Sequence, residues 1–196
     1  MLVFSAGKRL LVRLKASALA IWVCFFAFDP SLYTLLLFLA ILLHEMGHLF
    51  ALFLCGTERV TLTFSFFGAE LSAGGEMLGY RQQFWVSLGG ILCNLATAFL
   101  PLIVFPNETG ALFFAVASLC LAFLNLVPIK GLDGGRALEA ILLCKKEPET
   151  VERMQKKVTI VCLCGLFLLS LYVLLVSGFN FSLLLFTLYL SLSIFR

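Results

Sequence analysis

The sequence predicts an all-α polytopic membrane protein with about six transmembrane helices and a short β-hairpin after the second. The first observation behind this class is composition: the 196 residues are 62% hydrophobic and only 13% charged. Soluble domains are about 45–50% apolar and about 25% charged. The second observation is that six apolar stretches approach the length of about 20 residues that a spanning helix needs. These segments are 10–28, 31–55, 83–105, 111–129, 158–177 and 180–195.

The first and last of the six segments are the weakest. Arg13 and Lys15 interrupt the start of the first one. Their long side chains can extend to the headgroups, which leaves Ala16 to Phe28 as the apolar part. This stretch runs into Asp29 and Pro30 without a small-residue cleavage site, so a retained span is favoured over a signal peptide. The last segment is simply short.

The basic residues support six spans, because cytoplasmic loops carry an excess of Lys and Arg. With the N-terminus inside, all 14 basic residues fall on the inner side, and both termini are cytoplasmic. They are Lys8, Arg9, Arg13, Lys15, Arg59, Arg81, Lys130, Arg136, Lys145, Lys146, Arg153, Lys156, Lys157 and Arg196. Since they are dispersed over several loops, they form no basic patch, and no nucleic-acid partner is expected.

Two inner loops, about 56–82 and 130–157, are the only sizeable pieces outside the predicted spans. In the first loop, apolar side chains alternate with hydroxyl side chains over residues 60–66, which is the period of a strand. Gly68 and a second short stretch at 69–72 follow, so a hairpin is expected. An ordinary surface hairpin is one interpretation, and an edge strand that receives an extended peptide is the other.

The second span carries His44-Glu45-Met46-Gly47-His48, and these are the only two histidines in the chain. Side chains four residues apart lie on one face of a helix, so both imidazoles can bind one Zn²⁺. Glu45 adjoins the first ligand and can take a proton from a water that the metal polarises. A carboxylate within a span is costly and marks a functional site by default; a structural polar cluster between helices is the alternative.

A catalytic zinc usually has three protein ligands, and Asp133 is the candidate for the third. It stands at the inner end of the fourth predicted span, on the same side as the second half of the zinc-binding helix. From the residues alone, Asp133-Gly134 is equally well explained as a turn.

These motifs together resemble the site-2 protease family of intramembrane metalloproteases. The resemblance rests on the HExxH motif, on Gly90-x-x-x-Asn94, and on Asn125-x-x-Pro128 followed by Leu-Asp-Gly-Gly at 132–135. It covers roughly residues 35–140, and one departure from many family members is Lys130-Gly131. Among branches of the family, the layout looks most like the sporulation branch, typified by stage IV sporulation protein FB.

The resemblance implies roles for four residues outside the HExxH motif. Asp133 would be the third zinc ligand. Asn94 would contact substrate or support the oxyanion, and Asn125 with Pro128 would break the helix and admit substrate near the zinc. The hairpin at 60–72 is similar to one beside the family's active site, which is proposed to hold an unwound substrate.

The sequence therefore predicts one integral-membrane metalloprotease domain, 1–196, in a bacterial cytoplasmic membrane. Its catalytic core would be about 31–140, with additional helices at 10–28, 158–177 and 180–195. One zinc ion, held by His44, His48 and Asp133, would serve peptide hydrolysis with Glu45 as the base. The expected substrate is a single-span membrane-tethered regulator of the anti-sigma or pro-sigma type, and a membrane inhibitor protein is a further expected partner.

Two alternatives remain at the level of the sequence. A metal-binding membrane transporter would carry its buried charges along a path through the bundle, whereas here they gather at one depth. A catalytically silent relative that sequesters substrates would not need the complete set of His44, Glu45, His48 and Asp133.

Overall fold

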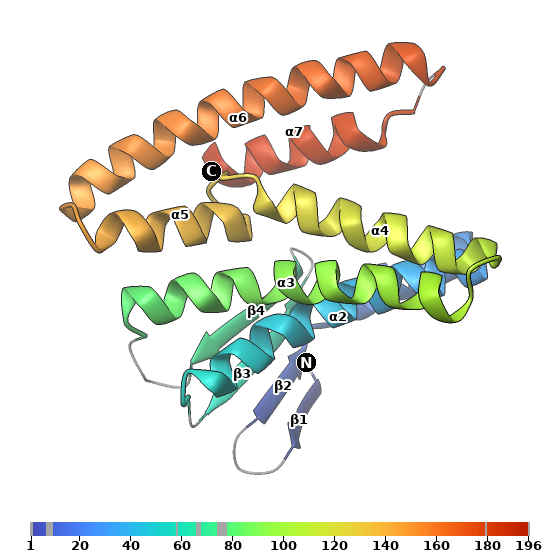
Figure 1. Cartoon of the computed structure of the whole chain (residues 1–196), viewed down its shortest axis with the longest axis horizontal. Coiled ribbons are helices and arrows are strands. Elements are labelled where there is room, and N and C mark those ends of the chain that lie inside the picture. Colours follow the sequence, from blue (N-terminus) through green and yellow to red (C-terminus); the bar gives the residue numbers. More distant parts are fainter. Residues whose placement is uncertain are drawn as a thin grey trace. The chain divides into compact units, whose positions relative to one another are not determined.

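The computed structural model describes residues 2–6, 10–57, 59–65, 68–73, 78–178 and 180–195. It is mostly helical, with one small sheet, and so confirms the predicted fold class (Figure 1). The chain contacts divide it into two compact units, residues 1–123 and 124–196. Each unit is described separately.

The first unit holds strands β1 (Leu2–Ala6), β2 (Leu10–Leu14), β3 (Val60–Ser65) and β4 (Gly68–Ala73). Its helices are α1 (Ala16–Phe28), α2 (Leu32–Leu54), α3 (Tyr80–Val104) and most of α4 (Thr109–Leu126). The second unit contains the end of α4, then α5 (Asp133–Leu143), α6 (Pro148–Val176) and α7 (Ser182–Phe195).

The prediction of six spanning helices is not confirmed. Within the described residues, four helices are long and apolar enough to cross a membrane: α2, α3, α4 and α6. α7 is a shorter apolar helix. The predicted loop 130–157 also contains more helix than expected, because α5 occupies its first half and α6 begins at Pro148, ten residues before the predicted span.

The first predicted span, 10–28, is divided between a strand and a helix. Residues 10–14 form β2, and only the 13 residues of α1 are helical. At about 1.5 Å per residue, α1 is roughly 20 Å long, which is less than the hydrocarbon thickness of about 30 Å. The backbone N–H and C=O groups of this segment form hydrogen bonds with β1 and β3. Arg13 is exposed on this strand and is not placed inside a spanning helix.

The predicted hairpin after the second span is confirmed, and it belongs to a larger sheet. β3 and β4 pair antiparallel, β2 pairs parallel with β3, and β1 pairs antiparallel with β2. The strand order is β1-β2-β3-β4, so β4 is an edge strand of the described sheet. Phe66, which the alternating pattern included, lies outside the described residues, as do Lys8, Arg9 and Arg196 of the charge argument.

This sheet determines how α1 and α2 are arranged. β2 precedes α1 and β3 follows α2, yet the two strands are neighbours, so the helix pair leaves the sheet and returns to it. Phe38 of α2 packs against α1, with ring centroids 6.0 Å from Trp22 and 5.0 Å from Phe26. α1 begins directly after β2 and is about ten residues shorter than α2. The last ten residues of α2, about 45–54, therefore lie beside the sheet.

The turn between α1 and α2 is tied by a carboxylate. Asp29 accepts a hydrogen bond from the Ser31 amide at 3.2 Å and another from the Thr34 hydroxyl at 2.9 Å. Bonds from the side chains of Ser31 and Thr34 to the carboxylate lower the pKa of Asp29. The turn thereby satisfies donors at the start of α2 that have no partner within the helix.

Candidate metal centre

α2 presents the HExxH residues at the depth of the sheet. His44 and His48 are both only 6% exposed, and Glu45 between them is half-buried. One helical turn separates the histidines, so their rings project from the same face. The ring planes are nearly perpendicular, with centroids 4.8 Å apart. Two buried imidazoles in this arrangement require a shared proton or a cation between them.

The nitrogen atoms of this pair have the spacing that zinc needs. The Nε2 atoms of His44 and His48 are 3.2 Å apart. With Zn–N bonds of about 2.0–2.1 Å, that separation corresponds to an N–Zn–N angle of about 103°, close to tetrahedral. The two histidines therefore fit one zinc ion without rearrangement of α2.

A backbone carbonyl of α3 orients His48. The Nδ1–H of His48 donates to the Val86 carbonyl oxygen at 2.7 Å, which leaves the lone pair of Nε2 directed at His44. A hydrogen bond from the second ring nitrogen is the usual way in which proteins select the tautomer of a metal-binding histidine. Nothing in the sequence indicated Val86, because the group that acts is its main-chain oxygen and any residue supplies one.

Glycines let α3 pass directly across the imidazoles. A Cβ atom on Gly90 would lie 2.5 Å from His48 Nε2 and 2.7 Å from His44 Cε1. A Cβ atom on Gly47 would meet the Gly89 carbonyl oxygen and lie 2.6 Å from Cys93 Cβ. Close approach at small residues is the common means of packing helices in lipid, where apolar side chains gain nothing from avoiding the solvent.

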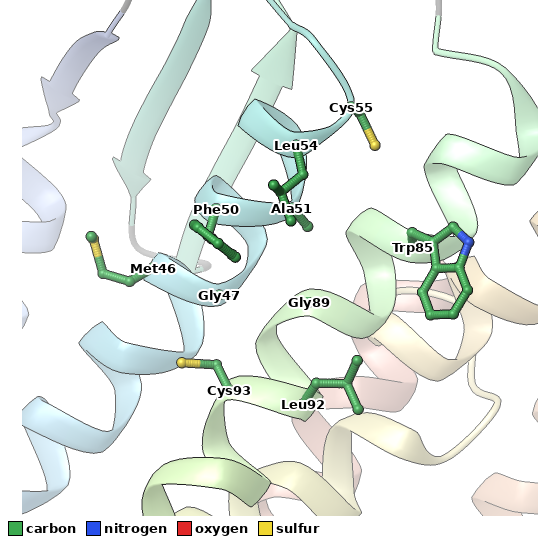
Figure 2. Close-up of a pocket in the computed structure, with 10 residues that line it drawn as sticks. All are labelled: Met46, Gly47, Phe50, Ala51, Leu54, Cys55, Trp85, Gly89, Leu92 and Cys93. Carbon is green, nitrogen blue, oxygen red and sulfur yellow. The ribbon is translucent and has the colours of Figure 1, made fainter.

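Figure 2 shows this helix crossing, with Gly47 of α2 opposite Gly89 of α3. An apolar cavity of about 710 Å³ lies there, lined by residues including Phe50, Trp85 and Leu92. None of the predicted site residues lines it. The cavity and the predicted metal site are therefore lined by different side chains.

Asn94 lies one helical turn beyond Gly90 on α3 and is completely buried. Its Nδ2 is 3.3 Å from Nδ1 of His44. Its Oδ1 finds no hydrogen-bond partner among the residues that the structure describes. The structure thus brings Asn94 together with the HExxH residues, in contact with a ligand.

In the second unit, Asp133 is the first residue of α5 and is 6% exposed. Arg136, one turn later, lies 4.0 Å from its carboxylate and is largely exposed. A carboxylate at a helix N-terminus is favoured by the helix dipole. Asp133 is therefore a buried carboxylate in the first turn of a helix, and the turn that the sequence suggested at Asp133-Gly134 lies just before it, at residues 130–131.

Two glycines allow the turn before α5 to be tight. Cβ atoms on Gly134 and Gly135 would collide with the carbonyl oxygens of Leu126 and Ile129, respectively. α4 ends at Leu126, two residues before Pro128, as expected where a proline follows. Asn125 and Pro128 are half-buried beside this turn. The predicted break in the helix is present; the roles of these two residues toward substrate remain predictions.

α6 holds the turn in place. Ile129 is fully buried against Leu163, Leu166 and Leu190. The Thr159 hydroxyl, itself 1% exposed, accepts a hydrogen bond from the Lys130 amide at 3.0 Å. The buried Gln155 donates to the Gly135 carbonyl oxygen at 3.1 Å. Sequence reasoning missed Gln155 and Thr159; polar residues inside the long apolar helix were the available signal.

Thr159→Val is expected to destabilise the second unit by about 0.5–1.5 kcal/mol, because the part-buried hydrogen bond from the Lys130 amide to the Thr159 hydroxyl is lost. The free energy of unfolding in mixed detergent measures this. Thr187→Val is the matched control: Thr187 is equally buried, but its hydroxyl donates to Leu183 of its own helix at 2.8 Å. Equal stability of the two variants would contradict the role of Thr159.

The comparisons with known proteins agree with this geometry. Residues 108–169 match the model of Peptidase family M50. A protein of Synechocystis sp. named as a candidate zinc metalloprotease, sll0528, is 31% identical in an alignment 116 residues long that covers 55% of this chain. The chain spans about 30% of the length of that relative.

A solved structure has the same fold. The site-2 protease from Methanocaldococcus jannaschii superposes with a TM-score of 0.65, covering 96% of this chain and 91% of that one, at 19% identity. The fold of this chain is therefore that of a site-2 protease.

Proposed function

We propose that this chain is an intramembrane zinc endopeptidase. It has the fold of a site-2 protease, and its residues 108–169 match the model of Peptidase family M50. The observation that carries the proposal is the pair of buried Nε2 atoms, 3.2 Å apart, beside Glu45 on a helix of membrane-spanning length. A structural polar cluster would not require the nitrogen separation of a tetrahedral zinc site.

His44 and His48 would hold the zinc, and Asp133 would be the third ligand. All three are buried, and two imidazoles with one carboxylate are a donor set found in catalytic zinc sites. When bound, zinc lowers the pKa of a water and polarises a carbonyl group. Glu45 then accepts a proton from water and returns it to the leaving amine.

The proposed substrate class rests on the position of the histidines in α2, a helix long and apolar enough to cross a membrane. A helical substrate in lipid keeps its amides in internal hydrogen bonds, so it has to unwind before any peptide bond is accessible. The strand β4 is at the edge of the described sheet, and one side of it is paired with no other described strand, so it could pair with an extended peptide. Asn125 and Pro128, where α4 ends, would admit that peptide.

The proposed substrate is a single-span membrane-tethered regulator of the anti-sigma or pro-sigma type, in a bacterial cytoplasmic membrane. We propose that both termini are cytoplasmic, so that the cleaved domain would be released into the cytoplasm by regulated intramembrane proteolysis. A role in sporulation and a membrane inhibitor protein are part of this proposal, and they rest on the resemblance of the motif layout to the sporulation branch.

Removal of the metal tests the proposal. The purified protein, in liposomes with a panel of tagged single-span regulators, is treated with a zinc chelator, and its zinc content is measured by mass spectrometry. Cleavage of at least one regulator is expected to stop when zinc is removed and to return when zinc is added. Cleavage that continues in protein free of zinc would contradict the proposed mechanism.

A further inference from the structure

α3 lies across both imidazoles, and it places one polar group beside the Nδ1 atom of each ring. Val86 lies opposite His48 Nδ1, and Asn94 lies opposite His44 Nδ1. The earlier residue of α3, Val86, contacts the later histidine of α2, and the later residue, Asn94, contacts the earlier one. The two helices are therefore antiparallel, and Gly90 lies between the two contacts. One face of α3 thus supplies a polar partner to each ring.

The two partners differ in what they can do. The Val86 carbonyl oxygen only accepts, so it holds His48 as the Nδ1–H tautomer. The Asn94 side chain carries both a donor and an acceptor. As it lies in the structure, its Nδ2 faces His44 at 3.3 Å, and its Oδ1 has no partner within the described part of the chain.

Zinc binding through Nε2 imposes a requirement on His44. The Nε2 lone pair goes to the metal, so the ring proton resides on Nδ1, which then needs an acceptor. An amide can turn by 180° about its Cβ–Cγ bond, which exchanges its oxygen and nitrogen with little change of shape. That turn would bring the unpartnered Oδ1 of Asn94 to the Nδ1–H of His44.

We propose that Asn94 is a positioning residue for the zinc ligand His44, accepting the Nδ1–H of that histidine through its side-chain oxygen when zinc is bound. The inference rests on the proposed zinc endopeptidase function, and it gives Asn94 a role through the metal instead of a direct contact with the peptide. Complete burial of Asn94 favours this role, because a group that meets substrate has to be reachable by it.

The test measures zinc affinity, which needs no proteolysis. Asn94→Leu has a similar volume and no acceptor, Asn94→Ala is a second variant without an acceptor, and Asn94→Asp keeps one. Thr97→Val is the matched control on the same helix: Thr97 is half-buried and its hydroxyl donates to Cys93 of α3 itself at 2.8 Å. Zinc dissociation constants come from chelator competition on the full chain in detergent, with circular dichroism as a check of folding.

Asn94→Leu and Asn94→Ala are expected to bind zinc about 10–100-fold more weakly than the unmodified chain. Asn94→Asp is expected to bind as tightly or more tightly, because a carboxylate accepts the same proton, and Thr97→Val should be unchanged. The visible absorption of bound Co²⁺, which reports on ligand geometry, should shift in the leucine and alanine variants only.

Unchanged zinc affinity in the folded leucine and alanine variants would overturn the inference while leaving the proposed function intact. If those variants kept zinc and lost cleavage, Asn94 would instead contact the substrate. Absence of zinc binding by the unmodified chain would overturn the proposed function itself, together with this inference.

Discussion

Replacing Glu45 with glutamine is expected to abolish peptide hydrolysis while the zinc content of the protein stays the same. Glu45 is half-buried next to His44, and the amide has nearly the same shape as the carboxylate but cannot accept a proton from water. General-base catalysis typically contributes about 10²–10⁴-fold to a rate, so residual cleavage should fall by at least that factor. Initial rates on a tagged single-span regulator, with zinc measured on the same samples, give both quantities.

Glu149→Gln is the matched control for this substitution. Glu149 lies in the first turn of α6, its side chain is 90% exposed, and it pairs with Arg153 at 3.8 Å. An exposed pair of this kind contributes little, so the rate should be that of the unmodified chain. Equal cleavage by Glu45→Gln and the unmodified chain, with zinc bound in both, would remove Glu45 from the mechanism.

Gly90→Ala is expected to eliminate zinc binding, and with it cleavage. The added methyl group would lie 2.5 Å from His48 Nε2 and 2.8 Å from His44 Nε2, that is, against the two atoms that face each other. Relief requires either that the imidazoles turn away or that α3 withdraws from α2. Withdrawal would also lengthen the bond from His48 to Val86. Zinc content and the chelator-derived dissociation constant measure the loss.

Gly165→Ala controls for the general effect of replacing a helical glycine. A Cβ atom on Gly165, in α6, would have no neighbour within 4 Å. Alanine has the higher helix propensity, by about 0.8–1.0 kcal/mol, so this variant should be at least as stable and bind zinc normally. Wild-type zinc affinity in Gly90→Ala would mean that α3 moves away easily, and the close approach at Gly90 would then have no role in holding the ligands.

The membrane-spanning helices and the pairing of His44 with His48 could be predicted from the sequence because both depend on local patterns. Apolar length predicts a spanning helix, and four of the six predicted segments form helices long enough to cross. The two histidines could be assigned to one site because spacing on a single helix already places them together. The hairpin was predictable for the same reason, since β3 and β4 are consecutive in the chain.

Contacts between distant residues had to come from the tertiary structure. The sequence of residues 10–14 predicts part of a spanning helix. In the structure this segment is a strand, because β3, about fifty residues later, pairs with it. His48 is oriented by a main-chain oxygen 38 residues away, and no side-chain pattern indicates which carbonyl that is. Asn94 belonged to a recognisable motif, but its neighbour depends on where α3 crosses α2. The sequence by itself determined that His44 and His48 lie on one face of one helix, because that depends on spacing within the helix. The packing of α3 on α2, made close by Gly47, Gly89 and Gly90, decided which groups lie beside the two imidazoles, because that depends on distances between helices.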